Sequence, residues 1–308
     1  MANKEHLALL EQGVASWNQW WDRQTEQATQ ANGATSDMAN LREADLHEAD
    51  LRQVNLSGAD LCMANLEGAN LRNANLEGAN LYTATLYIGN LREANLYQAD
   101  LREVNLSRAD LCMANLEKAN LAMANLEGAS LYTAILYVVN LREANLYKAD
   151  LREVTLSQAN MREANLRSAD LREADLSLSN LVGADLSKAS LYMANLVRAN
   201  LCMANLVGTN LYKANMLGVN LIGANLYKAN LPGANLQQAD LREATLSQAN
   251  LSHTNLQGAD LCMANLQQAN LTNANLIKAN LSKANLWEAN LNGARLTGAT
   301  MPDGSRHP

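Results

Sequence analysis

The amino-acid sequence predicts an all-β solenoid that is preceded by one short α-helix. Between residues 41 and 301, every fifth residue is Leu except at Met161, Met216 and Met301, which makes 53 consecutive frames without an insertion or deletion. Ala lies two residues before this position in 44 frames, and Asn or Asp lies one residue before it in 45 frames. A period of five excludes a single straight element, because each Leu would advance by about 140° around an α-helix and would alternate faces on a flat strand.

A chain that turns a corner once per five residues satisfies this pattern. Leu and Ala then point into a shared dry interior, and the two variable residues of each frame point outward, as in a solenoid built from very short strands. We expect Asn and Asp at the corners, since their short polar side chains form hydrogen bonds with nearby main-chain groups and favour turns. A Leu-filled interior leaves no cavity for a substrate.

Runs such as Ala64-Asn65-Leu66-Glu67-Gly68 resemble the pentapeptide-repeat protein family, and the resemblance covers residues 39–301. The tail from Met301 to Pro308 resembles that of many cyanobacterial members, as does the opening around Glu5 to Trp17. The resemblance implies a right-handed quadrilateral β-helix with four pentapeptides in each coil and therefore about 13 coils. The five-residue spacing alone leaves three-sided and four-sided solenoids open.

Residues outside the repeat form other elements. In residues 1–23, apolar residues recur at helical spacing behind a candidate N-cap at Asn3, which predicts an amphipathic helix over about residues 4–23. We expect this helix to cap the first coil, whose open edge would otherwise invite aggregation. Attachment to a membrane surface is the alternative, and the few cations of the helix disfavour it. Residues 24–38 are predicted to be a polar linker, and residues 302–308 a short C-terminal tail.

The composition predicts a cytoplasmic protein without a cofactor, since the sequence shows neither a secretory signal nor a long apolar run. All four cysteines occupy the first variable position of Leu-Cys-Met-Ala-Asn frames, too far apart for a disulfide on a four-sided solenoid. The four His show no spacing typical of metal ligands, either with one another or with the cysteines. We therefore expect free thiols and no metal site.

The function hypothesis that we favour is a non-enzymatic protein-interaction or scaffold protein, because no nucleophile and base pair and no phosphate-binding Gly motif occurs. The partner would be an unidentified protein, and the candidate contact residues on variable positions are Tyr132, Tyr137 and Trp287. No small-molecule substrate and no membrane partner are expected.

Two alternatives remain. The first comes from the resemblance, because some family members mimic duplex DNA and modulate type II topoisomerases such as DNA gyrase. The repeat region has 21 Lys/Arg and 25 Asp/Glu, a dilute negative charge for such mimicry. The second is a structural rod that oligomerises end to end, with a homodimer through the C-terminal end. Nucleic-acid binding is disfavoured, since the chain has a net charge of −7 and no clearly basic face.

Overall fold

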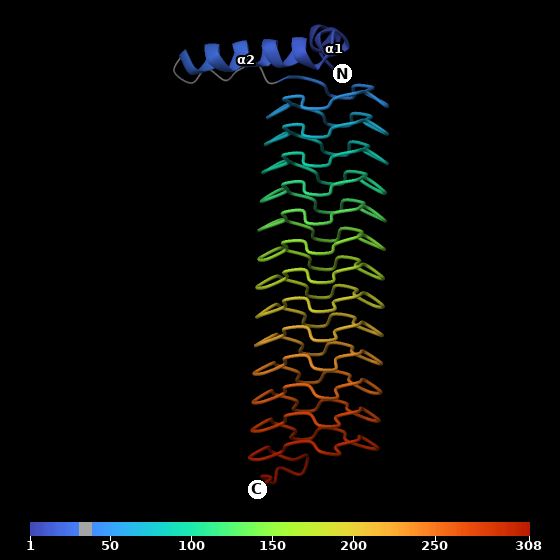
Figure 1. The fold of residues 1–308 in the computed structure, drawn as a ribbon, viewed down its shortest axis with the longest axis vertical. Coiled ribbons are helices and arrows are strands. Elements are labelled where there is room, and N and C mark those ends of the chain that lie inside the picture. Colours follow the sequence, from blue (N-terminus) through green and yellow to red (C-terminus); the bar gives the residue numbers. More distant parts are fainter. Residues whose placement is uncertain (31–38) are drawn as a thin grey trace. The chain divides into compact units, whose positions relative to one another are not determined.

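A computed structural model describes residues 1–30 and 39–308, and the chain divides into two compact units, Met1–Asn145 and Leu146–Pro308. The first unit begins with two helices, α1 (Lys4–Glu11) and α2 (Val14–Gln30), and the rest of both units is built from solenoid coils (Figure 1). Within the described part of the chain, neither helix has the length and apolar character needed to cross a membrane.

The structure corrects the predicted boundaries at the N-terminus. The single helix expected over about residues 4–23 is two helices, separated at Gly13, whose φ of 105° is not helical. α2 then continues through Gln30, because residues 24–30 contain no Gly or Pro that would stop it. Residues 24–30 of the expected linker are therefore helical, and residues 31–38 lie outside the described residues. Asn3 caps α1 as predicted, since its side chain accepts a hydrogen bond from the Glu5 N–H at 2.9 Å.

Both helices pack on the first coils of their own unit. The Trp17 side chain is fully buried, and its indole N–H donates to the main-chain carbonyl of Asn55 at 2.7 Å. The Asn18 side chain accepts a hydrogen bond from the Asn55 N–H at 2.8 Å, and the Asn40 N–H donates to His6 Nδ1 at 3.0 Å. Side chains from the helices thus satisfy main-chain groups that an uncovered first coil would leave unpaired.

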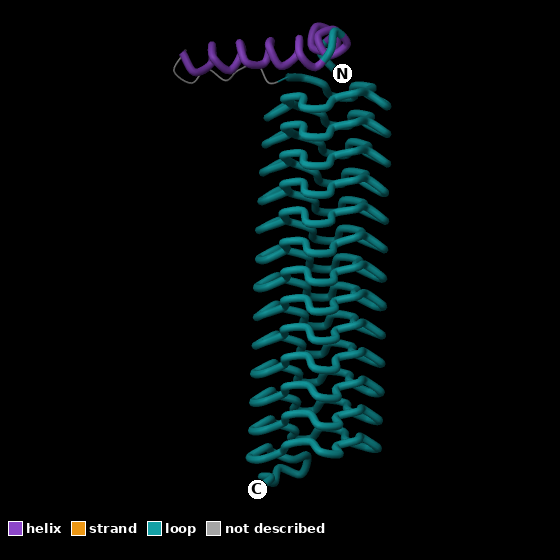
Figure 2. Tube along the Cα trace, viewed as in Figure 1, coloured by secondary structure: helices purple, strands orange, loops and turns teal. Residues whose placement is uncertain are grey.

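Parallel bridges link residues that are twenty apart, as between Asn40 and Asp60 in the first unit and between Asp150 and Asp170 in the second. Twenty residues are four frames, so one turn of either unit contains four pentapeptides. Each bridge involves one residue of each coil, and outside α1 and α2 the described residues form bridges and turns rather than strands of several residues (Figure 2). The very short strands of the prediction are therefore isolated bridges.

The corners lie at the two variable residues, and the expectation that Asn and Asp form them is wrong. From Glu43 to Gly298 the second variable residue of each frame has a positive φ, between 52° and 71°. Asn and Asp instead stand on the flat sides, where they form the bridges. Their side chains still bond nearby main chain, since the Oδ1 of Asn80, for example, accepts the N–H of Tyr82 at 3.2 Å. They stabilise the corner from the position before it.

The interior confirms the predicted role of Leu and Ala. The Leu and Met side chains of the repeat position are fully buried from Leu56 to Leu281. Main-chain bonds join each coil to the next, as from the Leu101 N–H to the Asn120 carbonyl at 2.7 Å. On the flat sides, the Asn side chains add a second ladder, in which the amide of Asn220 donates to Oδ1 of Asn200 at 3.0 Å. Apolar burial and hydrogen bonding therefore repeat with the same period.

The positive φ at the corners generates a prediction about stability. Ile88 has a φ of 52° and is 51% exposed, so a β-branched side chain holds a left-handed conformation while only about half of its surface is buried. We expect Ile88→Gly to increase the free energy of unfolding by about 0.5–1 kcal/mol. The substitution removes about 1–2 kcal/mol of backbone strain from the folded state, and the greater conformational entropy of Gly in the unfolded state offsets part of this gain.

The matched control is Ile135→Gly in the same unit, since Ile135 is 44% exposed but forms a bridge and has no positive φ. This substitution is expected to destabilise. Urea unfolding monitored by circular dichroism measures both effects. Equal destabilisation by the two substitutions would contradict the strain at position 88.

Candidate protein-contact surface

The outward surface of each unit consists of the two corner residues of every frame and the Asn or Asp column between corners. The first corner residue is held by the preceding Asn or Asp side chain, as Trp287 is by Asn285 Oδ1, which accepts its N–H at 3.1 Å. Residues at the same corner recur every twenty positions, so each corner presents a column of side chains at the coil spacing. Such columns offer fixed positions for contact groups on a rigid frame.

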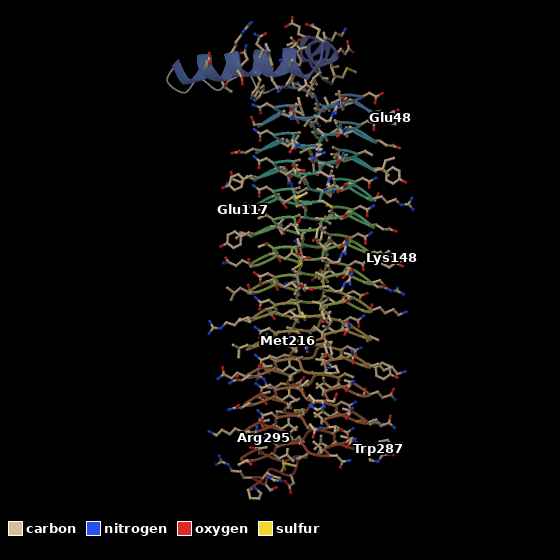
Figure 3. The ribbon with its side chains drawn as sticks, viewed as in Figure 1. Glu48, Glu117, Lys148, Met216, Trp287 and Arg295 are labelled. Atoms are coloured by element: carbon tan, nitrogen blue, oxygen red, sulfur yellow. The ribbon has the colours of Figure 1, made fainter. Side chains whose placement is uncertain are left out.

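The three candidate contact residues all lie at first corner positions, but the structure does not gather them into one cluster. Tyr132 and Tyr137 occupy successive corners of the first unit, where Tyr132 is 36% exposed and Tyr137 is half-buried. Trp287 belongs to the second unit, is 58% exposed and projects from its corner into solvent (Figure 3). Each unit therefore has its own candidate contact residues.

The sequence analysis missed a pair of stacked tyrosines in the second unit. The rings of Tyr192 and Tyr212 lie 5.6 Å apart with an interplanar angle of 10°, and the Lys213 ammonium group lies 5.3 Å from the Tyr212 ring centre. A pair of Tyr residues twenty positions apart was the available signal. It becomes informative only when one coil is known to contain four frames.

Corner arginines form ion pairs mainly with the Asp two residues earlier, although the sequence often places Glu directly after Arg. Arg102 forms two hydrogen bonds with the carboxylate of Asp100, at 2.8 and 2.6 Å, and the same arrangement recurs at Arg52, Arg152, Arg172 and Arg242 with the Asp two residues earlier. Arg142 and Arg162 do pair with the adjacent Glu. In these five frames a corner Arg thus neutralises the Asp that replaces Asn on the flat side, whereas Asp45 and Asp175 accept hydrogen bonds from Asn side chains instead.

These contacts shift the titration of the carboxylates. Hydrogen bonds from the Arg102 side chain hold the pKa of Asp100 below its ordinary value, although partial burial opposes the effect. The Arg242 side chain lowers the pKa of Asp240 in the same way. Both carboxylates are therefore ionised near neutral pH and act as structural partners of Arg.

The four cysteines are free thiols, as predicted. Cys62 and Cys112 are more buried than their corner positions suggest, with 2% and 7% exposure. Cys112 Sγ lies 3.1 Å from Ser130 Oγ, and burial raises the pKa of this thiol. The described residues bring no three His, Cys, Asp or Glu side chains together as a metal site.

The C-terminal end of the second unit is incompletely covered. Leu286, Leu291 and Leu296 are half-buried, whereas the preceding repeat leucines are fully buried. The tail folds back on the last frames, where Gly298 N–H donates to the His307 carbonyl at 2.9 Å and Arg306 forms an antiparallel bridge with Thr300. Among the described residues, no main-chain carbonyl accepts the N–H groups of Leu286, Glu288 or Leu291. The tail covers only part of this end.

The repeat matches a known protein family. The family profile described as Pentapeptide repeats (8 copies) matches overlapping segments that together cover residues 30–87 and 90–301. No curated protein matches the chain.

Among solved structures, the chain is similar to HetL, a pentapeptide repeat protein involved in heterocyst differentiation regulation from the cyanobacterium Nostoc sp. strain PCC 7120. The identity is 37% and the TM-score 0.37, over 76% of this chain and 92% of HetL. It is also similar to the pentapeptide repeat protein Rfr23 from the cyanobacterium Cyanothece 51142, with 36% identity and a TM-score of 0.19, over 38% of this chain and 58% of Rfr23. QnrB1, a plasmid-mediated fluoroquinolone resistance protein, shows 16% identity and a TM-score of 0.26, over 55% of this chain and 84% of QnrB1.

The Asp and Arg pairs predict how stability depends on pH. Because the folded-state pKa of Asp100 is below its ordinary value of 3.8, its ionised form stabilises the folded unit above pH ~4, and this contribution is lost as the pH falls through the folded pKa. We expect Asp100→Asn to be less stable than the parent at pH 7 and to lose less stability on acidification. Thermal unfolding at several pH values between about 7 and 3 measures this difference.

Glu127→Gln is the control, since Glu127 is exposed and its side chain forms no ion pair with any described residue. Its pH profile should parallel that of the parent. A parallel profile for Asp100→Asn would contradict the structural role of the pair.

Proposed function

Because the chain belongs to the pentapeptide-repeat family, we propose that it is a non-enzymatic protein-interaction or scaffold protein. Proteins of this family are generally structural or interaction proteins rather than enzymes. The interior supports the proposal, since the repeat leucines fill it from Leu56 to Leu281 and any chemistry would have to occur on the outer wall. The regular corners instead suit recognition of another protein.

The observation that carries the proposal is a large apolar side chain held on a rigid corner beside an open edge. Trp287 is 58% exposed, and its neighbours Leu286 and Leu291 are only half-buried. Trp is enriched among the residues that dominate binding energy in protein interfaces, and exposed apolar surface next to polar groups is typical of contact sites. The partner is a protein whose apolar surface covers Trp287, and Tyr132 and Tyr137 are the candidate anchors on the first unit.

The proposal includes several expectations about the protein as a whole. We place it in the cytoplasm, without a cofactor, a small-molecule substrate, or a membrane or nucleic-acid partner. We also take the 53 frames to form one right-handed stack of about 13 coils, as is characteristic of the family.

A second candidate function, a structural rod that pairs through its C-terminal end, is favoured by the unpaired edge there. The N–H groups of Leu286, Glu288 and Leu291 face outward from the last coil without main-chain acceptors among the described residues. An exposed row of main-chain donors and acceptors is a template for pairing with another chain. A second copy carries the same edge and the same half-buried leucines.

Modulation of DNA gyrase by DNA mimicry is the weaker alternative, and charge density is the reason. Residues 39–145 of the first unit contain 8 Lys/Arg and 14 Asp/Glu, a net charge of −6. About five coils at ~4.8 Å span roughly 25 Å, over which duplex DNA carries about 15 charges. Several of the carboxylates are also neutralised by Arg, as Asp50 and Asp100 are.

The interaction proposal predicts the result of an affinity capture from the native cell. With the intact chain as bait, we expect a protein that is retained at stoichiometric amounts and lost with Trp287→Ala, because truncation of a central aromatic anchor costs about 2 kcal/mol or more of binding energy. Tyr132→Ala and Tyr137→Ala report on the first unit. The matched control is Ile277→Ala, a half-buried apolar corner residue of the second unit. The proposal would be contradicted if the purified chain turned over metabolites and substitutions of outward residues abolished that turnover.

End pairing predicts a concentration-dependent dimer in analytical ultracentrifugation. Leu291→Asp places a carboxylate on the open edge and should weaken this dimer by about tenfold or more, since an unpaired charge is costly to bury. Fold integrity is checked by the circular dichroism spectrum. A parent chain that stays monomeric at all accessible concentrations would remove this candidate.

A further inference from the structure

The second unit carries a surface recess on one flat side that neither proposed function uses. The recess has a volume of about 490 Å³, and its lining residues are Asp170, Arg172, Ser190, Tyr192 and Asn210. Parallel bridges join Ser190 to Asp170 on one coil and to Asn210 on the next. All other residues of this column, from Asp150 to Asn290, are Asn or Asp. The recess exists because the Ser190 side chain is shorter than theirs.

An Asp on another flat side of the same unit shows which donors the shorter Ser leaves without an acceptor. Asp175 Oδ1 accepts the side-chain amide of Asn195, one coil later, at 2.8 Å and the N–H of the corner residue Ser177 at 3.1 Å. The equivalent donors at the recess are the Asn210 side-chain amide and the Tyr192 N–H. Among the described residues, no oxygen accepts a hydrogen bond from either group.

The remaining lining residues add donors and leave few free acceptors. Arg172 donates to the Asp170 carboxylate, from Nε to Oδ1 at 2.8 Å and from Nη2 to Oδ2 at 2.6 Å. This contact neutralises Asp170 and occupies both of its oxygens, and it leaves Nη1 of Arg172 as an unused donor. The Ser190 hydroxyl forms no hydrogen bond with another described residue. The lining therefore has no net charge and a surplus of donors.

We propose that the recess binds a carboxylate group of a ligand. One carboxylate oxygen accepts the Asn210 amide and the Tyr192 N–H, as Asp175 Oδ1 does with its own two donors. The other oxygen faces the Arg172 guanidinium and the Ser190 hydroxyl. Hydrogen bonds to an ionised acceptor are about twice as strong as those between neutral groups, which favours a carboxylate over a neutral carbonyl. The carboxylate belongs either to an acidic side chain of a protein or to a free organic acid.

A stacked aromatic pair forms one wall of the recess. The Tyr192 ring lies 5.6 Å from the Tyr212 ring at an interplanar angle of 10°, so its position is fixed by the coil that follows. Lys213 lies over the Tyr212 ring at 5.3 Å, and the exposed Glu173 stands on the opposite side of Tyr192, so the charges around the recess balance. An aromatic or apolar group attached to the carboxylate can pack on the Tyr192 ring.

The inference is independent of the proposed contact at Trp287 and of end pairing at Leu291, because neither residue lines the recess. The test is a titration of the intact chain with benzoate, followed by nitrogen–proton correlation NMR. The Asn210 side-chain amide and the Tyr192 N–H should shift saturably, with a dissociation constant of about 1–10 mM. Benzamide has the same shape but lacks the charge and places an NH2 group among the donors. It should bind at least about fivefold more weakly.

Ser190→Asn tests the recess itself. The introduced amide oxygen supplies an acceptor for the two unused donors and fills the space, so benzoate should bind at least about tenfold more weakly and the unfolding temperature should not fall. The matched control is Ser252→Asn, because Ser252 lies on the same corner as Tyr192 but three coils later. This control should change the dissociation constant by less than about twofold.

Asn210→Asp removes the donor and keeps the coil contacts. The Oδ1 atom of Asn210 accepts the Tyr212 N–H at 3.2 Å and the Asn230 amide at 3.1 Å, and a carboxylate oxygen can accept both. The substitution also places a negative charge beside the ligand. Benzoate should therefore bind at least about tenfold more weakly, and circular dichroism establishes that this variant folds.

A second probe distinguishes the two sources of the carboxylate. N-acetylglutamate N-methylamide presents the group on a peptide side chain, whereas benzoate presents it on a free organic acid. Tighter binding of the peptide probe assigns the recess to an acidic side chain of a protein, and tighter binding of benzoate assigns it to a free acid. Three results would overturn the inference: shifts that do not saturate at Asn210 and Tyr192, benzamide binding as tight as benzoate binding, or unchanged benzoate binding by Ser190→Asn.

Discussion

The main-chain ladder between coils twenty residues apart is the constraint on which the rest of the structure depends. A coil of four pentapeptides has no hydrogen-bonding partner within itself apart from its tight corners, so its N–H and C=O groups must pair with the coils on either side. The same stacking closes the interior over Leu and Ala. Neither contribution suffices alone, because one coil buries too little apolar surface and leaves its main chain unpaired.

Because of this dependence, the first and last coils of a stack have main-chain groups that no neighbouring coil can pair. At the N-terminus, α1 and α2 supply donors and acceptors from Trp17, Asn18 and His6 to the first coils. At the C-terminus, the tail bonds main-chain groups of Lys283, Gly298 and Ala299. The amides of Leu286, Glu288 and Leu291 find no main-chain acceptor among the described residues, and the last leucines stay half-buried. The proposed contact at Trp287 follows from this asymmetry between a covered and an uncovered edge.

The corners separate what the fold requires from what the surface can vary. Each second corner residue adopts a left-handed conformation, so Gly is favourable there, and the frame nevertheless tolerates Glu, Lys, Met and even Ile88. Because the ladder and core hold the corner, its side chains are free to carry individual chemistry. Apolar pairs such as Cys202 and Met203 and charged pairs such as Arg162 and Glu163 are compatible with the same main chain. Recognition can therefore change along a unit without a change of fold.

The amino-acid sequence by itself determined the solenoid, its boundaries within residues 39–301 and its Leu interior, because a strict five-residue period admits few structures and repeats 53 times. It misplaced Asn and Asp at the corners and joined α1 and α2 into one helix, since turn propensity does not reveal which residue of a frame takes a positive φ and Gly13 alone marks the break.

Only the tertiary structure decided which residues share a corner. Tyr192 and Tyr212 become partners because one turn contains twenty residues. Arg102 pairs with Asp100 rather than with Glu103 because of the side-chain directions at its corner. The contact surfaces depend on the same information. Met203 and Gly223, for example, are neighbours only because residues twenty apart are stacked, which converts a linear sequence into columns.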